Sequence, residues 1–535
     1  ISKYYWGNRV GFTAEVFGGH SWVIEQRMQW YRDEILKAGG DIWFAAIGCG
    51  AFVEGDDVQG AVVVTSQGRG VVLADVVIDA TGNSDVAAAA GAECIYTDAS
   101  EFAMQGTGLP PRQLGASYTN TDYTLSDETD MVDVWRMFVH AKDKFPTAFD
   151  LGQLIDTRER RRIIGDYTLD ILDQVNNRTF PDTVVLAYSN LDTHGYTIDP
   201  YFMLEHPMKK GIYCNIPYRC FLPKGYDGLL VAGLGISAHR DAVPVTRMQP
   251  DIQNGGYAMG VAAAMASRAN APLRKIDLKA LQRHLVDIGN LPLGVLTDED
   301  SFPPSLEQIK AAVQTVADEN APGAAVVLAS PKQALPLLRE AYQTADGQRK
   351  LGYAKVLGMM GDATGLATLM AAVEGTAEWD EGWDFRSGGQ FGHAMSPLDC
   401  LIVALGRTRS PQAVPVILDK LALLSADAAF SHHRAAALAL ELIGDERAAK
   451  PLAELLEKPG MTGYAHVSLA RVRELDQGGS PNATRRDSLR ELLLARALYR
   501  CGDNEGLGQE ILGEYAKDLR GHLARHAVAV LKSLK

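Results

Sequence analysis

The sequence has little cysteine and no paired cysteine motif. Its 535 residues include six cysteines, at Cys49, Cys94, Cys214, Cys220, Cys400 and Cys501. No two of them form a C-x-x-C pair, so the spacing indicates neither a zinc site nor a redox dithiol. We expect scattered buried thiols, and the count alone leaves disulfides open.

Long apolar runs and an excess of positive charge are missing as well. No stretch approaches the roughly eighteen consecutive apolar residues that a membrane-spanning helix needs. The formal net charge of −14 and the pI of about 5.4 argue against nucleic acid or an anionic membrane surface as the main partner. With 47% hydrophobic and 22% charged residues, the composition is typical of a soluble bacterial-type protein of two or more domains. It leaves cytoplasm and periplasm open.

The N-terminal residues, ISKYYWGNRVGF, lack an initiator methionine. They also lack the basic segment and the apolar segment that a secretory signal peptide needs. We therefore expect that Ile1 is not the natural start of translation.

The first half of the chain has the pattern of an α/β domain. Residues 21–38 carry apolar positions at helical spacing between a capping serine and a glycine pair, which predicts a helix. Residues 41–82 alternate short apolar runs with glycine and acidic turns, which predicts a hairpin or small meander and then a buried strand. A second buried strand is predicted at 228–233, and a Gly/Ala-rich helix at 251–268.

The character of the sequence changes near residue 290. The segment GNLPLGVLTDEDSFPPS indicates a linker, and amphipathic helices in pairs follow it. Four apolar helix ends run into turn glycines, at Gly361, Gly406, Gly444 and Gly502. Their separations of 45, 38 and 58 residues resemble the period of HEAT-type helical repeats, with an insertion in the last one. The alternative is an irregular helical bundle.

These patterns divide the chain into three consecutive segments. We predict an α/β domain at 1–290, a linker and first helix at 291–330, and an all-α HEAT-like repeat domain at 331–535. Residues 376–397 interrupt the repeats with four aromatic residues and His393. This insertion is either structural or a loop that reaches the first domain or shapes a sugar-like pocket.

Four segments of the first half, taken in order, carry a family resemblance. Residues 76–85 read VVIDATGNSD, a buried strand that runs into a tight turn and a small-residue helix. Residues 216–268 contain a Pro-Tyr-Arg segment, a strand ending in Ala-Gly, a histidine loop and the Gly/Ala-rich helix. An arginine-rich block at 156–182 and an Asp-Thr-His segment at 191–199 lie between them. This order resembles the FAD-dependent oxidoreductase family over roughly residues 1–270.

The resemblance implies an α/β flavoprotein fold, namely the distal part of an FAD domain with a mixed α+β substrate region. FAD is the implied cofactor, and its implied contacts are Asp79, Ala80, Thr81, Gly82, Gly233, Gln249, Pro250, Gly255 and Gly256. A side chain at Gly82 would crowd the approach of the backbone to the cofactor. The Gly/Ala-rich helix would direct its positive N-terminus at the pyrimidine edge of the flavin.

One feature of that family has no counterpart in the sequence. The loop G-x-G-x-x-G, which holds the FAD pyrophosphate at a helix N-terminus, is missing. The nearest string, GCGAFV at 48–53, has a valine in place of the last glycine and lies in the predicted hairpin. We expect the missing part in a second polypeptide or in an N-terminal segment outside this sequence, and we expect an oligomer.

Oxidation of an alcohol needs a base near the carbinol proton, and histidine titrates in the right range. His239 is the first candidate and His194 the second. Arg247, just before the cofactor helix, would stabilise anionic reduced flavin or a substrate oxyanion. The candidates for substrate binding are Arg160, Arg162, Tyr218 and Arg219. The alternatives are structural histidines and a solvated basic helix.

We predict a dehydrogenase that transfers a hydride to FAD from a CH–OH group of a polar substrate, such as a carbohydrate or a hydroxy acid. No metal site is predicted, because adjacent residues such as His432 and His433 point about 100° apart on a helix. One alternative is a helical-repeat scaffold with a degenerate flavin-like domain. Another is a lyase or isomerase that uses flavin transiently. The electron acceptor stays open.

Overall fold

The computed structural model describes residues 24–101, 107–108, 122–123, 127, 130–144, 158–193, 195–205, 211–384, 394–475 and 482–533. The chain forms two compact units, and each is discontinuous in sequence. The first unit contains Ile1–Ile95, Arg160–Asn190 and Gly211–Phe302. The second contains Tyr96–Glu159, Leu191–Lys210 and Pro303–Lys535. The chain therefore passes between the units five times, whereas the three segments predicted from the sequence are consecutive.

A three-stranded antiparallel meander begins the first unit. Helix α1 (Ile24–Lys37) precedes strands β1 (Ile47–Glu54), β2 (Asp57–Thr65) and β3 (Gly68–Leu73), which pair in that order. The predicted helix and the predicted meander are both confirmed over the described residues. Several apolar side chains of α1 and the meander are exposed, with Leu73 the most exposed of them.

The two predicted buried strands form one parallel pair. Strand β4 (Val77–Asp79) pairs with β11 (Leu229–Val231), with Asp79 opposite Val231. The amide of Ala232 donates to the carbonyl oxygen of Asp79 at 2.9 Å and extends the ladder by one bond. Two stretches about 150 residues apart in the sequence thus end side by side.

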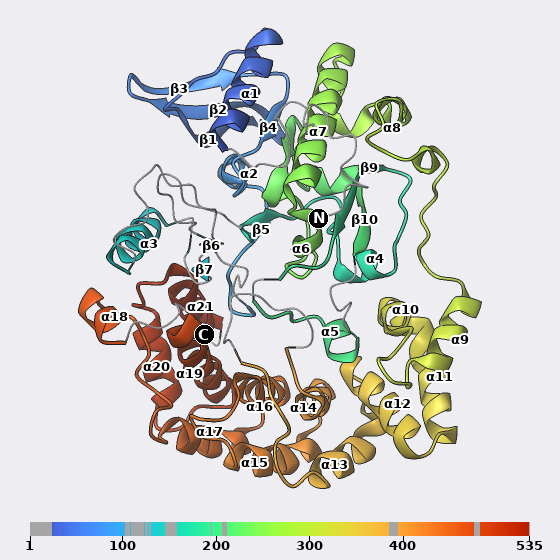
Figure 1. Cartoon of the computed structure of the whole chain (residues 1–535), viewed down its shortest axis with the longest axis vertical. Helices are drawn as coiled ribbons and strands as arrows, with labels where there is room; N and C mark the ends of the chain where they lie inside the picture. The colour runs from blue at the N-terminus through green and yellow to red at the C-terminus, as the bar shows by residue number, and fades with distance from the viewer. Residues whose placement is uncertain are drawn as a thin grey trace. The chain divides into compact units, whose positions relative to one another are not determined.

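The Gly/Ala-rich segment forms helix α7 (Gln249–Ala269), which packs on β4 and on β9 (Thr183–Ser189), as Figure 1 shows. Its buried alanines at four-residue spacing are Ala258, Ala262 and Ala266. Small side chains on one helical face allow the helix axis to approach the strands closely.

Short elements complete the first unit. Strand β9 pairs antiparallel with β10, and β5 pairs antiparallel with β8. The bounds are β5 (Cys94–Ile95), β8 (Arg162–Ile163), β10 (Ile212–Pro217), α2 (Asp85–Ala90), α4 (Ile171–Val175), α6 (Val243–Thr246), α8 (Leu278–Asp287), η1 (Tyr218–Phe221), η2 (Gly233–Gly235), η3 (Leu273–Lys275) and η4 (Leu293–Leu296).

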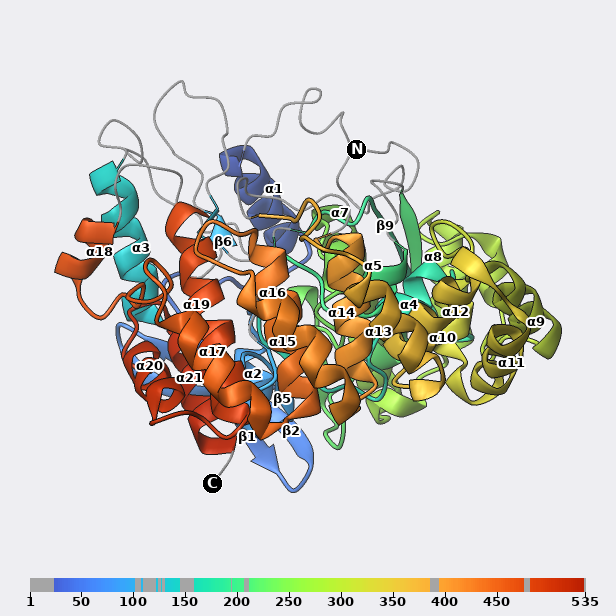
Figure 2. The ribbon, with the colours of Figure 1, turned by 90° about the horizontal axis from the view of Figure 1, so that it is seen from below.

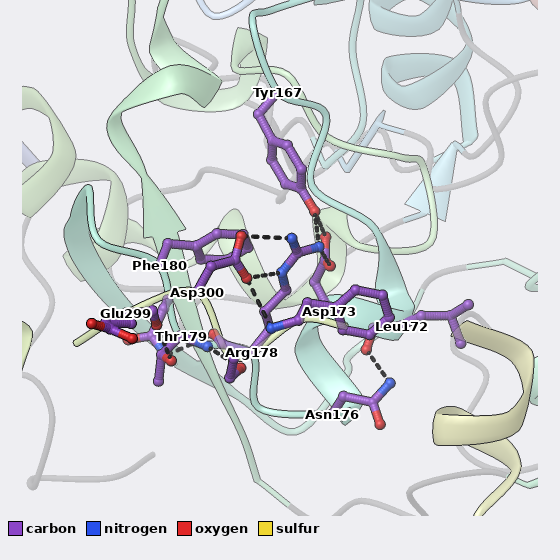
Figure 3. A network of polar contacts seen from close by, with 12 residues as sticks. Tyr167, Leu172, Asp173, Asn176, Arg178, Thr179, Phe180, Glu299 and Asp300 are labelled. Atoms are coloured by element: carbon purple, nitrogen blue, oxygen red, sulfur yellow. Dashed lines mark hydrogen bonds and ion pairs between the residues drawn. The ribbon is translucent and has the colours of Figure 1, made fainter. Parts of the chain in front are cut away.

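Arg178 holds the last residues of the first unit in place (Figure 3). Its guanidinium makes two bonds of 2.9 Å to the carboxylate of Asp300 and one of 3.0 Å to Asp173. The same group lies over the rings of Phe180 and Phe302, at 4.8 and 4.6 Å from their centroids. The start of the predicted linker is therefore bound to the first unit by charge-assisted and stacking contacts.

The second unit is built from paired helices. The helices α12 (Gly347–Met359), α14 (Pro397–Arg407), α16 (Phe430–Ile443) and α19 (Asn482–Arg500) each pack on the next, as Figures 1 and 2 show. A second set of helices packs against them: α13 (Leu366–Glu374) on α12 and α14, α15 (Val414–Ala422) on α16, α17 (Ala449–Leu456) on α19, and α20 (Leu507–Tyr515) on α19.

The remaining elements of the second unit are β6 (Thr107–Gly108), β7 (Asp122–Tyr123), α3 (Met131–Lys144), α5 (Tyr201–Leu204), α9 (Leu306–Thr315), α10 (Ala324–Ala329), α11 (Pro331–Thr344), α18 (Leu469–Leu475), α21 (Gly521–Ser533), η5 (Ala363–Gly365), η6 (Pro411–Ala413) and η7 (Glu446–Ala448).

The helix pairs share one turn design. Gly361, Gly444 and Gly502 have φ values of 83°, 69° and 101°, which glycine adopts without strain. An aspartate follows each glycine and accepts hydrogen bonds from amides farther along the chain; Asp362 and Asp445, for example, each accept one at 2.9 Å. Three of the four predicted turn glycines are thus confirmed as turn residues.

The prediction for Gly406 was wrong. This residue lies inside α14, and the positive-φ residue of that turn is Arg409, at φ 56°. A β-carbon at Gly406 would collide with the backbone and side chain of Ala439 in α16. Glycine is needed there because the two helices approach closely. A sequence pattern does not distinguish a glycine required by helix packing from a glycine required by a turn.

Segments from the first half of the sequence belong to the second unit. His522 bonds the hydroxyl of Thr97 at 2.9 Å, and His526 Nδ1 lies 2.6 Å from the carbonyl oxygen of Asp98. Arg434 donates to the carbonyl of Thr197 at 2.8 Å. Buried side chains of the C-terminal helices therefore bind residues that the sequence pattern assigns to the first domain, through backbone carbonyls and the Thr97 hydroxyl.

The six cysteines are free thiols, so the question left open by their count is settled. Cys49 is exposed, Cys94 is half-buried and the other four are buried, as expected for scattered core thiols. Within the part of the chain that the structure describes, no helix combines the length and hydrophobicity that crossing a bilayer requires.

Candidate cofactor site

Two glycine turns meet at the carboxyl ends of β4 and β11. Gly82 has φ 78° and Gly233 has φ 82°. A β-carbon at Gly233 would meet only Ile252, at 3.9 Å, and one at Gly82 would meet only Arg160, at 3.7 Å. Ligands of open parallel sheets bind outside the carboxyl ends of the strands, so the approachable backbone here is a candidate ligand cradle.

Asp79 and Thr81 build the first turn. Asp79 is 2% exposed, and its Oδ1 accepts from the amide and the hydroxyl of Thr81 at 3.0 and 2.7 Å. Its Oδ2 accepts from the amide of Ala87 in α2 at 2.9 Å, and the Thr81 hydroxyl accepts from the amide of Asp85 at 2.9 Å. These two side chains serve the protein backbone. Gly82 and the exposed backbone at Ala80 form the rest of the turn.

The segment Arg160–Arg162 links the two turns. Arg161 donates to the carbonyl of Asn83 at 2.9 Å and pairs with Asp85 at 2.6 Å. Arg162 is 4% exposed and donates through Nε to the carbonyl of Ala238 at 2.9 Å. Arg160 and Arg162, the two substrate candidates of this segment, both lie beside the turns, and Arg162 has a protein partner there; their binding of a substrate stays a prediction.

Two serines that the sequence patterns did not single out bind the loops at this end of the strands, and Ser84 joins the two turns. Ser84 Oγ donates to the carbonyls of Gly235 and Arg161 at 3.2 and 3.3 Å. Ser237 Oγ accepts from the amide of Gly165 at 2.9 Å. The one available signal was a small polar residue directly beside each glycine turn, which is common in loops and therefore weak.

His239 lies in the loop after β11, as predicted. Its amide donates to the carbonyl of Leu169 at 2.7 Å, and its Nδ1 accepts from the amide of Asp241 at 3.3 Å. An acceptor bond at Nδ1 places the proton of the neutral ring on Nε2. His194, the second candidate, lies outside the described residues.

The first turn of α7 already contains a carboxylate. Asp251 is 2% exposed and accepts from the amide of Tyr188 at 3.4 Å. Gln249 is exposed and Pro250 is buried beside it, while Arg247 is half-buried just before the helix. The predicted contact between this helix end and the flavin stays a prediction.

Two glycines farther along α7 have different neighbours. A β-carbon at Gly255 would lie 3.4 Å from the ring of Phe221, whereas one at Gly256 would meet nothing within 4 Å. Gly255 therefore serves close packing inside the first unit, and Gly256 adjoins open space.

Two of the substrate candidates have protein partners. Arg219 makes bonds of 2.9 and 3.0 Å to the carboxylate of Asp182, and this hydrogen bonding raises the pKa of the guanidinium. Tyr218 is 4% exposed, and its hydroxyl donates to the carbonyl of Leu273 at 3.2 Å. Both residues lie in η1, directly after the end of β10, and each has a structural contact.

The adjacent histidines of the second unit point to different neighbours. His432 Nδ1 lies 2.7 Å from the carboxylate of Asp399 and its Nε2 lies 3.1 Å from the carbonyl of Asp380, so both nitrogens face acceptors. Burial acts to lower the pKa of His432, but the bond to Asp399 outweighs it and the pKa is raised. Burial lowers the pKa of His433 to about 3.

The described part of the predicted insertion lies beside His432. The ring of Trp379 stacks on the imidazole with centroids 4.3 Å apart, and both residues line a cavity of about 480 Å³. Residues 385–393, including His393, lie outside the described residues. Among the residues that the structure describes, no three His, Cys, Asp or Glu side chains gather as metal ligands.

Comparison with known families gives two matches. The model of the family described as FAD dependent oxidoreductase matches residues 19–145 and 128–285. The model described as PBS lyase HEAT-like repeat matches residues 433–458, which include most of α16 and all of α17. No curated protein and no solved structure matches the chain.

Proposed function

Because residues 19–285 belong to the FAD dependent oxidoreductase family and HEAT-like repeats follow them, we propose that this chain binds FAD at the two glycine turns and takes part in a redox reaction there. The observation that carries the proposal is the pairing of β4 with β11, which brings Gly82 and Gly233 together from distant parts of the sequence.

The residues at these turns fit such a cofactor. Neither glycine is covered by protein backbone, because a β-carbon would make only an ordinary contact with one side chain, Arg160 at Gly82 and Ile252 at Gly233. Asn254, near the start of α7, is 5% exposed, and its side-chain oxygen has no protein hydrogen-bond partner. When bound, FAD supplies the hydride acceptor, and the chain supplies binding, orientation and proton handling.

We propose that the substrate is a polar molecule with a CH–OH group, such as a carbohydrate or a hydroxy acid. With its proton on Nε2, His239 donates a hydrogen bond to the substrate hydroxyl oxygen and so orients the CH–OH group of the substrate. The base that removes the hydroxyl proton is then His194 or another group, because Nδ1 of His239 already accepts from Asp241.

We further propose that a partner segment completes the cofactor site. Strand β4 pairs with β11 on one side, and among the described residues no strand pairs with its other edge. A segment that adds a parallel strand there and carries a glycine-rich phosphate loop fits that edge. It belongs to a second polypeptide or to further residues of the same polypeptide.

Native protein purified with all associated polypeptides tests the proposal. We expect a yellow preparation whose flavin absorbance bleaches when a hydroxy acid or a sugar is added without oxygen. Heat-released FAD, identified by chromatography, gives the stoichiometry. A colourless complex with bound protein partners would instead favour the repeat-scaffold alternative.

A further inference from the structure

The described part of the insertion, residues 376–384, binds the N-terminal ends of two repeat helices, and we call it the strap. Asp380 Oδ2 accepts from the amide of Leu398 in the first turn of α14 at 3.0 Å. Asp384 Oδ1 accepts from the amide of Phe430, the first residue of α16, at 2.7 Å. The strap therefore satisfies amides that a helix N-terminus leaves without an intrahelical partner.

His432 joins the strap to α14. Its Nδ1 lies 2.7 Å from the buried carboxylate of Asp399, and its Nε2 lies 3.1 Å from the backbone carbonyl oxygen of Asp380. A carbonyl oxygen and an ionised carboxylate both accept hydrogen bonds and donate none. The two contacts are therefore hydrogen bonds at the same time when both ring nitrogens carry a proton, which is the imidazolium form.

The surroundings of His432 favour that charged form. The ring of Trp379 stacks on the imidazole with centroids 4.3 Å apart, and an aromatic face attracts a cation. Burial acts to lower the pKa of His432, but Asp399 from α14 and Asp380 from the strap raise it, and the net shift is upward from 6.5. Geometry and charge thus agree on the protonated ring.

Other titratable groups surround this contact. Glu378 of the strap lines the same cavity as His432, and Lys420 of α15 donates to the carbonyl of Ala377 in the strap. Burial, together with the charge of Arg490 on α19, lowers the pKa of His433 to about 3, so this neighbouring ring is neutral. Of the two adjacent histidines, His432 is the one whose charge changes near neutral pH.

We propose that His432 is a pH-sensitive clamp, whose imidazolium binds the strap to α14 and whose deprotonation releases the strap at Asp380. The neutral ring has one N–H, so it can bond Asp399 or Asp380 but not both, and its other nitrogen then faces an acceptor. The cavity of about 480 Å³ is lined by residues on both sides of this contact, so its wall loosens when the clamp opens. All these residues belong to the second unit, and the clamp does not depend on the proposed flavin site.

The direction of the pH effect follows from linkage. The pKa of His432 is raised in the folded chain, so its contribution to stability is complete below pH 6.5. That contribution is lost as the pH rises through the folded pKa. We therefore expect a closed strap in mildly acidic solution and a released strap in alkaline solution.

The first test follows the fluorescence of Trp379 from pH 6 to pH 9, in the full chain with any polypeptides that purify with it. An imidazolium stacked on an indole quenches its fluorescence. Because the chain has seven tryptophans, the difference between wild type and Trp379→Phe isolates this ring. The signal should rise with pH, with a midpoint above 6.5. Asp399→Asn keeps an acceptor oxygen but removes the charge, and it should lower the midpoint by roughly one pH unit or more.

Hydrogen exchange reads the strap itself, after correction for the intrinsic exchange rate at each pH. The amide of Leu398 bonds Asp380, and the amide of Ser431 bonds the carbonyl of Trp383 at 3.1 Å. Both should lose protection over the pH range of the fluorescence change. In His432→Gln, which cannot titrate, fluorescence and protection should not follow that transition. His284→Gln, which removes an exposed histidine of the first unit, should leave the transition unchanged.

Each result supports or overturns the clamp. A shared midpoint above pH 6.5 that falls in Asp399→Asn supports it. A flat Trp379 signal in wild type, or the same transition in His432→Gln, overturns it. A fluorescence transition without loss of protection at Leu398 shows a titrating ion pair that releases nothing, and it also overturns the clamp. If one variant unfolds, as circular dichroism would show, the wild-type profiles and the other variant decide.

Discussion

Buried polar side chains hold backbone in place in both units, but over very different distances along the chain. At the Gly82 turn, the partners of Asp79 are two and eight residues away. In the second unit, the partners of His522 and His526 are 425 and 428 residues away. The same chemistry thus makes a local turn in one unit and closes a very long loop in the other.

The difference decides what each contact contributes. A local contact shapes a segment whose ends are already close, so its loss loosens one turn. A contact that closes a long loop holds a segment against helices that are far away in the sequence, as Arg496 also does through the carbonyl of Ser100. Damage to the second unit should therefore reach farther than equivalent damage to the first.

The largest expected effect follows from removal of Arg496 in the second unit. Its side chain is 3% exposed and makes bonds of 2.8 and 2.7 Å to Glu441. Arg496→Met removes the buried positive charge that pairs with the buried carboxylate of Glu441. The loss should lower the free energy of unfolding by about 3 to 5 kcal/mol. Urea unfolding followed by circular dichroism measures it.

A matched control is Arg447→Met, which breaks an Arg–Asp pair whose arginine is 54% exposed. That variant should leave the unfolding curve unchanged, because an exposed pair is screened by solvent. Equal shifts for the two variants would contradict the importance assigned to burial.

The next effect concerns Asp79 in the first unit. Asp79→Ala removes all three acceptor bonds and leaves the buried amide of Ala87 unsatisfied, which should cost about 2 to 3 kcal/mol. Asp79→Asn keeps one acceptor and should cost less. Hydrogen exchange at the α2 amides reports the loss locally. A uniform loss of hydrogen-exchange protection across both units would show that the contacts of Asp79 stabilise more than the local turn.

A smaller effect is expected on acidification, through His526. Its Nδ1 faces the carbonyl of Asp98, and its Nε2 accepts from Arg496 at 3.2 Å, so the folded ring is neutral. Burial, with help from the charge of Arg496, lowers the pKa to about 3 from an ordinary 6.5. The unfolded chain therefore takes up a proton first, and stability is lost as the pH falls from 6.5 toward 3.

Between pH 7 and pH 5 the loss should be about 2 kcal/mol. In His526→Gln, which cannot titrate, that part of the pH dependence should disappear. Unfolding curves at pH 7, 6 and 5 for both proteins make the comparison. Parallel pH dependence in the two would rule out His526 as the group responsible.

The smallest effect belongs to a repeat turn. Gly444 has φ 69°, and a β-carbon added there would meet only a carbonyl oxygen, at 4.0 Å, so Gly444→Ala introduces backbone strain without collision. A cost of about 1 kcal/mol is expected. Gly513→Ala, inside α20 with nothing within 4 Å, should be neutral or stabilising. Thermal melts of the two variants distinguish strain from the mere addition of a methyl group.

Local signals made part of the fold predictable from the sequence. The buried strands at β4 and β11, the meander and the turns at Gly361 and Gly444 are each indicated by patterns within about ten residues. The family match over residues 19–285 agrees with the order of those signals. Gly406 shows the limit, because its need for glycine comes from Ala439 on another helix.

The candidate site was predictable in position but not in roles. The sequence pointed to Asp79, Gly82 and Arg160, and the structure places all three at one turn. It did not reveal that Asp79 serves the backbone or that Arg219 pairs with Asp182. Those roles depend on which acceptor lies opposite each side chain, and residue type alone carries no such information.

The five passages of the chain between the units have a consequence for synthesis. Asp98 leaves the ribosome 428 residues before His526, its partner in the second unit. At about 5 to 20 residues per second, that backbone waits roughly 20 to 90 s for its binding site to exist. The second unit is therefore completed only when α21 has emerged, and the Asp98 backbone needs protection until then.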